Sequence, residues 1–182
     1  MAYFEDLSDY CYHRDGYLPG TRNVGWLDSK HDFPRQVPTQ EFWSRLWEHA
    51  KISVVQMRGL HFCELCEPRP RLVYAIKDGV RLQLGSSEIR VLSKRNKIYA
   101  APTLIYHYVR THDYRPPDEF IDALTTGLTP PNAKYFESLT KFGLDWRQTS
   151  SGDFPPRGFR SGRVDGRIQV VEIEVPTYVD EI

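Results

Sequence analysis

Two pairs of residues in the sequence have the spacing of metal ligands. Cys63 and Cys66 are separated by two residues, and His107 and His112 lie five positions apart. Zinc prefers thiolate sulfur and imidazole nitrogen in a closed tetrahedron, and a Cys-x-x-Cys turn lets one loop offer two sulfurs to one ion. The His spacing also falls within the range seen in such sites. The sequence therefore predicts one zinc ion held by Cys63, Cys66, His107 and His112.

The predicted ion is structural, because four protein ligands leave no position for a reactive water. About 40 residues separate the two pairs, so the ion would join a loop to a distant helix rather than form a small independent finger. One geometric condition follows. Five steps along a regular helix turn by about 140°, so His107 and His112 share a face only if the helix distorts near its end. The segment from Asp113 to Pro117 favours such a distortion.

Other interpretations of these residues stay open at this stage. The cysteines could be buried apolar residues, and the histidines could make ordinary hydrogen bonds. His61 is close enough in sequence to compete as a ligand, whereas Cys11 with His13 is a weaker candidate pair. The order of the motifs does not fit a zinc deaminase, and no metalloprotease, nucleophile-elbow or phosphate-binding motif is present.

The elements that must position these residues indicate an α+β fold. We expect a small antiparallel sheet with one helix before it and a group of short helices after it. The structural zinc would join a loop of the sheet to the first of these later helices. Apolar spacing of 3.6 residues, Pro at helix starts and Gly at helix ends predict helices over residues 39–51, 103–112, 117–126 and 131–142. Short β-branched and aromatic runs predict strands over residues 52–57, 72–76, 80–84, 88–92, 97–100 and 168–175. The first 38 residues are expected to be irregular.

Composition limits the range of functions. The 24 Lys and Arg residues equal the 24 Asp and Glu residues, so no overall field attracts nucleic acid or anionic lipid. The sequence has no secretory signal and no apolar run long enough to span a membrane. Three cysteines, two of them in one motif, favour a reducing compartment. We therefore expect a cytoplasmic protein that does not bind membranes.

The chain is expected to divide into a zinc-stabilised domain over residues 1–147 and a second segment over residues 148–182. The first part of that segment is rich in Ser, Gly, Pro and Arg, which is typical of a flexible linker. Its end is expected to be an edge strand or a tail.

Four blocks of the sequence carry a resemblance to a known family: residues 3–10, 24–27, 59–66 and 99–120. The third has the form Gly-x-His-x-Cys-x-x-Cys, and the fourth reads YAAPTLIYHYVRTHDYRPPDEF. In these blocks, over about residues 3–124, the chain resembles a family of mostly bacterial proteins of unknown function. The resemblance implies a zinc-binding fold but no reaction.

Three functions remain as hypotheses. The first is a non-enzymatic zinc protein that binds another protein, of which an immunity role is one form. The second is nucleic-acid binding, suggested by the zinc-finger order of the ligands and by Arg157, Arg160, Arg163 and Arg167. The third is a metal-dependent hydrolase or nuclease that uses His61, Glu64 or Asp113 beside the ion.

Overall fold

The structure is a computed structural model, which describes residues 2–57, 59–148, 157–164, 167–174 and 177–181. The helices of this part are α1 (Gln40–Ala50), α2 (Ile105–Thr111), α3 (Asp118–Thr126), α4 (Ala133–Lys141) and the 3-10 turn η1 (Arg14–Gly16). The strands are β1 (Thr21–Asn23), β2 (Ile52–Val54), β3 (Leu72–Lys77), β4 (Val80–Leu84), β5 (Glu88–Leu92), β6 (Ile98–Pro102), β7 (Trp146–Gln148), β8 (Arg157–Val164), β9 (Arg167–Glu174) and β10 (Thr177–Glu181).

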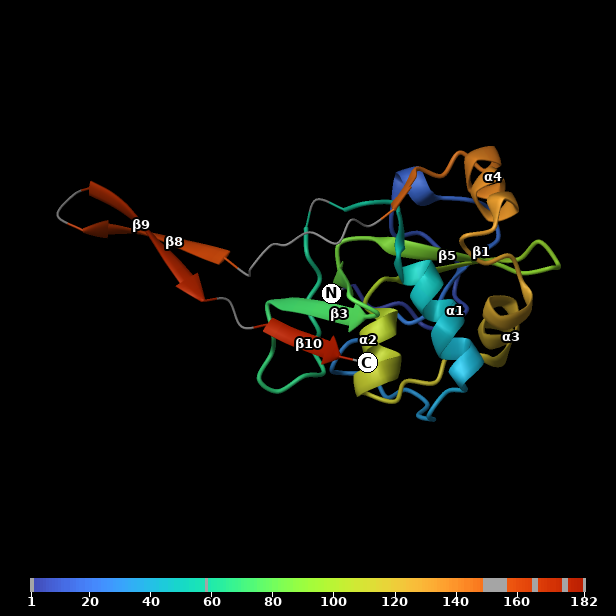
Figure 1. Cartoon of the computed structure of the whole chain (residues 1–182), viewed down its shortest axis with the longest axis horizontal. Helices are drawn as coiled ribbons and strands as arrows, with labels where there is room; N and C mark the ends of the chain where they lie inside the picture. The colour runs from blue at the N-terminus through green and yellow to red at the C-terminus, as the bar shows by residue number, and fades with distance from the viewer. Residues whose placement is uncertain (1, 58, 149–156, 165–166, 175–176, 182) are drawn as a thin grey trace.

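The strands form three sheets (Figure 1). The largest has the order β1-β6-β5-β2-β7, a second has the order β10-β3-β4, and β8 pairs only with β9. Hairpins connect β3 to β4 and β5 to β6 in antiparallel fashion, whereas β1 with β6 and β10 with β3 are parallel pairs. The fold is therefore α+β, with a mixed central sheet.

The helix α1 shows how local sequence fixes an element and its buried face. The backbone N–H of Phe42 donates to the Thr39 hydroxyl at 3.3 Å, which caps the first turn. Phe42, Leu46, Trp47 and Ala50 recur along one face, and all four are buried. The Trp47 ring lies 5.4 Å from the ring of Tyr106 in α2. The apolar face of α1 thus packs against the helix that carries His107.

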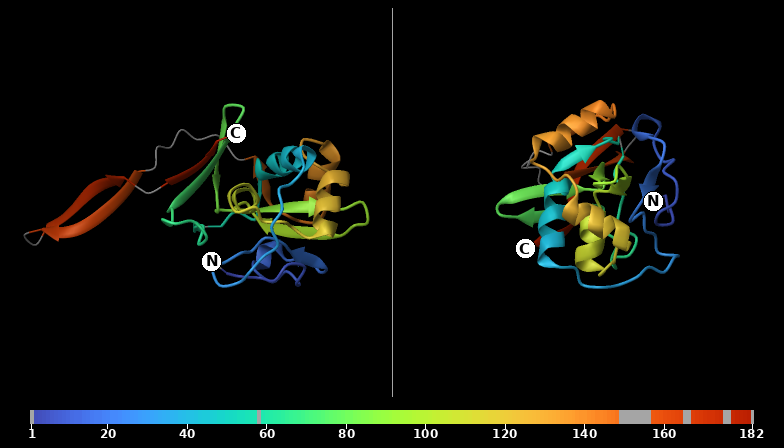
Figure 2. Two further views of the ribbon diagram at one scale, coloured as in Figure 1. Left: turned by 90° about the horizontal axis from the view of Figure 1, so that it is seen from below. Right: turned by 90° about the vertical axis from the view of Figure 1, so that its right-hand side faces the viewer.

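Strands β5 and β6 form the centre of the molecule, and every residue of both is buried. Helices cover one face of their sheet and the N-terminal segment covers the other (Figure 2). Tyr99 lies on the helix side, with its ring 5.8 Å from that of Phe120 in α3. Ala100, its neighbour on the opposite face, packs with Tyr10 and Trp26 of the N-terminal segment. Both faces of these strands are buried, so the two charged residues of β5, Glu88 and Arg90, pair with each other inside the protein.

The predicted fold class and most of the predicted elements are confirmed. Each of the four predicted helices is present, as are the strands predicted over residues 52–57, 72–76, 80–84, 88–92 and 97–100, with shifts of a few residues at their ends. The sheet differs from the prediction, because it is divided and partly parallel. Strands β1 and β10 lie far along the chain from their partners, so no hairpin turn restricts their direction. The irregular N-terminal segment also contains η1 and β1.

The segment after residue 147 contains more strand than its composition suggested. Strand β8 lies within the predicted linker, of which residues 149–156 and 165–166 fall outside the described residues. The predicted strand over residues 168–175 is β9, which pairs with β8, and the edge strand of the second sheet is β10. The division at residue 147 stays a prediction. None of the helices among the described residues has the length and apolarity needed to cross a membrane.

Candidate metal centre

Two sulfur atoms reach the site from the loop that joins β2 to β3. Cys63 is fully buried and Cys66 is 7% exposed, although the loop around them has no regular secondary structure. Both side chains point to the same place, as the Cys-x-x-Cys spacing predicts. A single turn of the loop thus supplies half of a tetrahedral ligand set.

Two imidazole rings reach the same place from α2 and the residue that ends it. His107 lies in the middle of α2, and His112 is the first residue beyond the helix, with φ −114° and ψ 7°. Asp113 then adopts a left-handed conformation with φ 55°, which stops the helix. The ring centroids of His107 and His112 are 5.1 Å apart. The end of the helix therefore removes the angular mismatch that the five-residue spacing would otherwise create.

The four side chains form a compact donor set. Cys63 Sγ lies 3.3 Å from His112 Nε2, and Cys66 Sγ lies 3.3 Å from His107 Nε2 and 3.4 Å from His112 Nε2. All four donor atoms lie within 4.8 Å of one another. Bonds of about 2.3 Å to sulfur and about 2.0 Å to nitrogen would separate these two atoms by about 3.5 Å in a tetrahedron. Cys63, Cys66, His107 and His112 are thus positioned to bind a metal ion.

The protonation chemistry of the site also suits a metal. Burial raises the pKa of the Cys63 thiol, but hydrogen bonds from His107 and His112 and the positive charge of His107 outweigh burial and lower this pKa from 9.0 to about 6. The lowered pKa favours the thiolate form of Cys63, which is the form that binds metals. The nearby Tyr108 hydroxyl has a pKa well above its usual 10.0, because it is buried and close to the negative charges of Cys63 and Glu64.

A further residue, Thr111, orients one of the ligands. Its hydroxyl oxygen lies 3.2 Å from Nδ1 of His107. When Nδ1–H donates to this oxygen, Nε2 carries the lone pair that faces Cys66 and can bind a metal. Thr111 was not among the site residues predicted from the sequence. Its position four residues after His107, on the same helix face, is a signal that could have identified it.

The competing candidates lie elsewhere. His61 Nε2 is 2.7 Å from the hydroxyl oxygen of Tyr12, and His61 is not part of the four-residue donor set. Cys11 is an exposed free cysteine, and His13 Nδ1 accepts a hydrogen bond from the backbone N–H of Asp15. Of the carboxylates considered for catalysis, Asp113 is exposed and Glu64 is half-buried, and neither belongs to the donor set.

Comparison with known proteins identifies a family but no characterised relative. No curated protein and no solved structure matches the chain. Residues 2–125 match the model of a family described as a domain of unknown function (DUF7919), and this range includes all four donor residues. The match spans more than half of the sequence and agrees with the resemblance seen in its four blocks. The chain therefore belongs to this family of proteins with a domain of unknown function.

Proposed function

We propose that the chain is a non-enzymatic zinc protein whose ion stabilises a protein-binding module. The observation that carries this proposal is the closed donor set of Cys63, Cys66, His107 and His112. Two thiolates and two imidazoles fill the four positions of a tetrahedral zinc ion, so no position remains for a reactive water. A catalytic zinc normally has three protein ligands and one open position.

The donor types favour zinc over other ions. Sulfur and nitrogen ligands exclude the oxygen-seeking ions Mg²⁺ and Ca²⁺, and a tetrahedral set of two sulfurs and two nitrogens is typical of Zn²⁺. A reducing cytoplasm would keep both cysteines available as thiolates.

The ion would link two parts of the chain that are distant in sequence. Cys66 and His107 are 41 residues apart, and Cys63 and His112 are 49 residues apart. We call the loop that joins β2 to β3 the cysteine loop. Without the ion, its cysteines would have no covalent link to α2, although His61 would still hold the loop to Gly85 and Tyr12. Structural zinc sites bind with an apparent free energy of about 10–16 kcal/mol, most of which appears as folding stability. Removal of the ion should therefore release the cysteine loop and destabilise the sheet and helix that the loop connects.

The proposed role as a protein-binding module rests on the exposed apolar surface. Few large apolar side chains are exposed among the described residues, and two of them, Leu60 and Phe62, lie three residues and one residue before Cys63 in the sequence. An ion that only stabilised the core would not require these side chains at the surface. We infer that the ion holds the cysteine loop in the conformation that binds a partner.

The first test is elemental analysis of the purified chain, combined with thermal melts before and after treatment with a chelator. We expect one zinc ion per chain, and a clear fall in melting temperature when the ion is removed. Cys63→Ser should lose both zinc and stability, whereas the matched control Cys11→Ser changes an exposed cysteine and should retain both.

X-ray absorption on the wild-type protein tests the closed coordination without any variant. We expect two sulfur ligands at about 2.3 Å and two nitrogen ligands at about 2.0 Å. An oxygen ligand that exchanges with solvent would contradict the structural role and would favour a hydrolase or nuclease. Unchanged melting after complete removal of the ion would show that it does not stabilise the fold.

A further inference from the structure

A hollow lies at the surface beside the candidate metal centre. It has a volume of about 460 Å³ and is lined by residues 60–64 and 69–71, so both arms of the cysteine loop form its walls. This volume is in the range of pockets that hold small ligands or single side chains of a partner. The hollow shares only Cys63 with the donor set, and the other three donor residues do not line it.

Apolar side chains on one wall of the hollow are exposed. Leu60 is 36% exposed and Phe62 is 47% exposed, whereas Cys63 is fully buried and His61 is half-buried. Exposure thus alternates along residues 60–63, as in an extended chain with one side facing inward. Because Phe62 is 47% exposed, it forgoes part of the about 1.5–3 kcal/mol that full burial of its ring would contribute, and together with Leu60 it offers apolar surface to a partner.

The loop is anchored on its inner side, which fixes this arrangement. The backbone N–H of His61 donates to the carbonyl of Gly85 at 2.8 Å, and the His61 ring is hydrogen-bonded to Tyr12. Cys63 is held in the donor set. Because His61 and Cys63 are both fixed, Phe62 between them cannot turn inward without breaking one of these contacts. The exposed ring is therefore pre-organised for binding.

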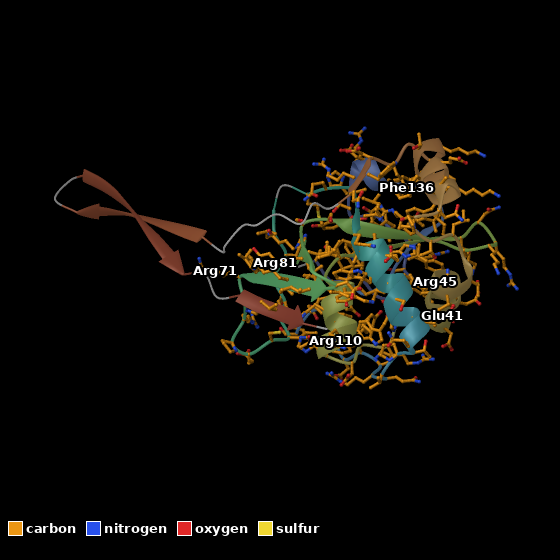
Figure 3. The ribbon with its side chains drawn as sticks, in the orientation of Figure 1. Glu41, Arg45, Arg71, Arg81, Arg110 and Phe136 are labelled. Carbon is orange, nitrogen blue, oxygen red and sulfur yellow. The ribbon has the colours of Figure 1, made fainter. Side chains whose placement is uncertain are left out.

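The opposite wall is positively charged. Arg69 and Arg71 are both exposed and lie on either side of the buried Pro70. Figure 3 shows Arg71 where the loop leads into β3. Within the part of the chain that the structure describes, neither guanidinium forms a salt bridge. Glu64 is the acidic residue in the lining, so the lining carries a net charge of +1, from two arginines and one glutamate.

We propose that this hollow binds a short acidic segment of a partner protein. An apolar side chain of the segment packs against Leu60 and Phe62, and adjacent Asp or Glu carboxylates bind the guanidinium groups of Arg69 and Arg71. Arginine suits this role because its planar fork matches a carboxylate. The proposal rests on the proposed function and specifies the surface and the chemistry of its partner.

The charge distribution favours an acidic peptide over a nucleic acid. A protein that binds single-stranded nucleic acid normally has a positively charged groove that runs along the backbone of several nucleotides. Here the lining of the hollow contains two arginines and also Glu64, while the whole chain has a net charge of zero. A peptide needs only one apolar anchor and one or two charge contacts, for which a Kd on the order of 1–100 µM is reasonable.

The test is selection from a displayed library of random 12-residue peptides on the zinc-loaded full chain. We expect enrichment of sequences in which an apolar residue is flanked by Asp or Glu. Binding of the selected peptides should fall at least tenfold in Arg69→Glu/Arg71→Glu and in Phe62→Ser. The matched control is Lys94→Glu/Arg95→Glu, which makes the same charge change at two exposed residues of another loop and should bind normally.

Zinc content and melting temperature are measured for every variant, so that the two proposals fail in different ways. A folded, zinc-loaded chain that enriches no acidic peptide would overturn the binding site while leaving the structural zinc intact. Equal binding to wild type and to Arg69→Glu/Arg71→Glu would also overturn it. A labelled dT20 oligonucleotide is tested in parallel, and oligonucleotide binding lost in the same variants would show that the hollow is a nucleic-acid site instead.

Discussion

The hydroxyl oxygen of Thr111 lies 3.2 Å from Nδ1 of His107, one helical turn away. A Thr111 hydroxyl that accepts from Nδ1–H would hold the proton of the imidazole on Nδ1, with Nε2 facing Cys66. Partners of this kind orient a metal ligand, and their loss typically lowers metal affinity about 10–100-fold. We therefore expect Thr111→Ala to weaken zinc binding by such a factor, measured by competition with a chromophoric chelator.

Thr111→Ser is the matched control, because it retains the hydroxyl and removes only a methyl group. It should bind zinc nearly as tightly as the wild type. Equal affinities for all three proteins would show that the helix alone orients His107.

A second prediction concerns Gly85, which anchors the cysteine loop. Gly85 has φ +92°, and a Cβ atom there would lie 2.4 Å from the carbonyl oxygen of His61. Gly79 has a similar φ of +74°, but a Cβ atom there would meet nothing within 4 Å. Gly79→Ala should therefore cost only the strain of a left-handed alanine, about 1 kcal/mol. Gly85→Ala should cost clearly more, because the loop must also move away.

Urea denaturation of both variants measures the difference in the free energy of unfolding. Gly85→Ala should also reduce zinc affinity, since His61 and Cys63 belong to the same loop. Equal losses of stability in the two variants would mean that the loop yields to the added Cβ atom without cost.

The sequence predicted those parts of the site that depend on local pattern. Cys63 with Cys66 and His107 with His112 are close in sequence, and their chemistry restricts the ion that they suit. Helix α1 was predictable because its cap and its apolar face are local as well. The distortion needed at the end of α2 could also be anticipated from the residues that follow His112.

The remaining features depend on contacts between distant residues. Tyr10 and Glu88 are 78 positions apart, and Tyr12 and His61 are 49 positions apart. Nothing in the local sequence around either residue identifies its partner. The parallel pairing of β10 with β3 also joins distant segments, and Ser, Gly and Arg in residues 157–164 favoured a linker where β8 forms a strand. The composition of a segment indicates only its local preference. Residues 157–164 form a strand because they pair with β9.

A third prediction concerns the buried ion pair between Glu88 and Arg90. Both side chains are fully buried, and Arg90 donates to the Glu88 carboxylate and to the carbonyl of Gly16. Tyr10 donates to the other oxygen of Glu88 at 2.8 Å. Burial raises the pKa of Glu88, and Arg90 opposes this effect. Arg90→Met would leave the carboxyl without its partner, and we expect a loss of about 3–5 kcal/mol in the free energy of unfolding.

The double variant Glu88→Gln/Arg90→Met removes both charges and retains an acceptor for Tyr10. It should be more stable than Arg90→Met, because it buries no unpaired charge. Denaturation of the two single variants and the double variant completes a mutant cycle. A double variant whose loss equals the sum of the two single losses would show that the charges do not interact.

The last prediction is a pH dependence that arises from His49 in α1. Its side chain is fully buried, and this burial lowers its pKa from 6.5 to about 4. Between these two values the unfolded chain binds a proton that the folded chain does not bind. The stability contributed by neutral His49 is therefore complete above pH 6.5 and is lost as the pH falls toward 4. The maximum loss is about 3 kcal/mol.

His49→Gln isolates this contribution, because glutamine does not titrate and can still donate to the carbonyl of Arg45, which His49 Nδ1 contacts at 3.0 Å. Release of a metal ion at low pH would affect the wild type and the variant alike, so it would cancel when their unfolding free energies are subtracted. We expect this difference to shift in favour of the variant as the pH falls from 6.5 to 4. A difference that stays constant over this range would mean that His49 becomes protonated within the folded chain, which would require water to reach the core beneath α1.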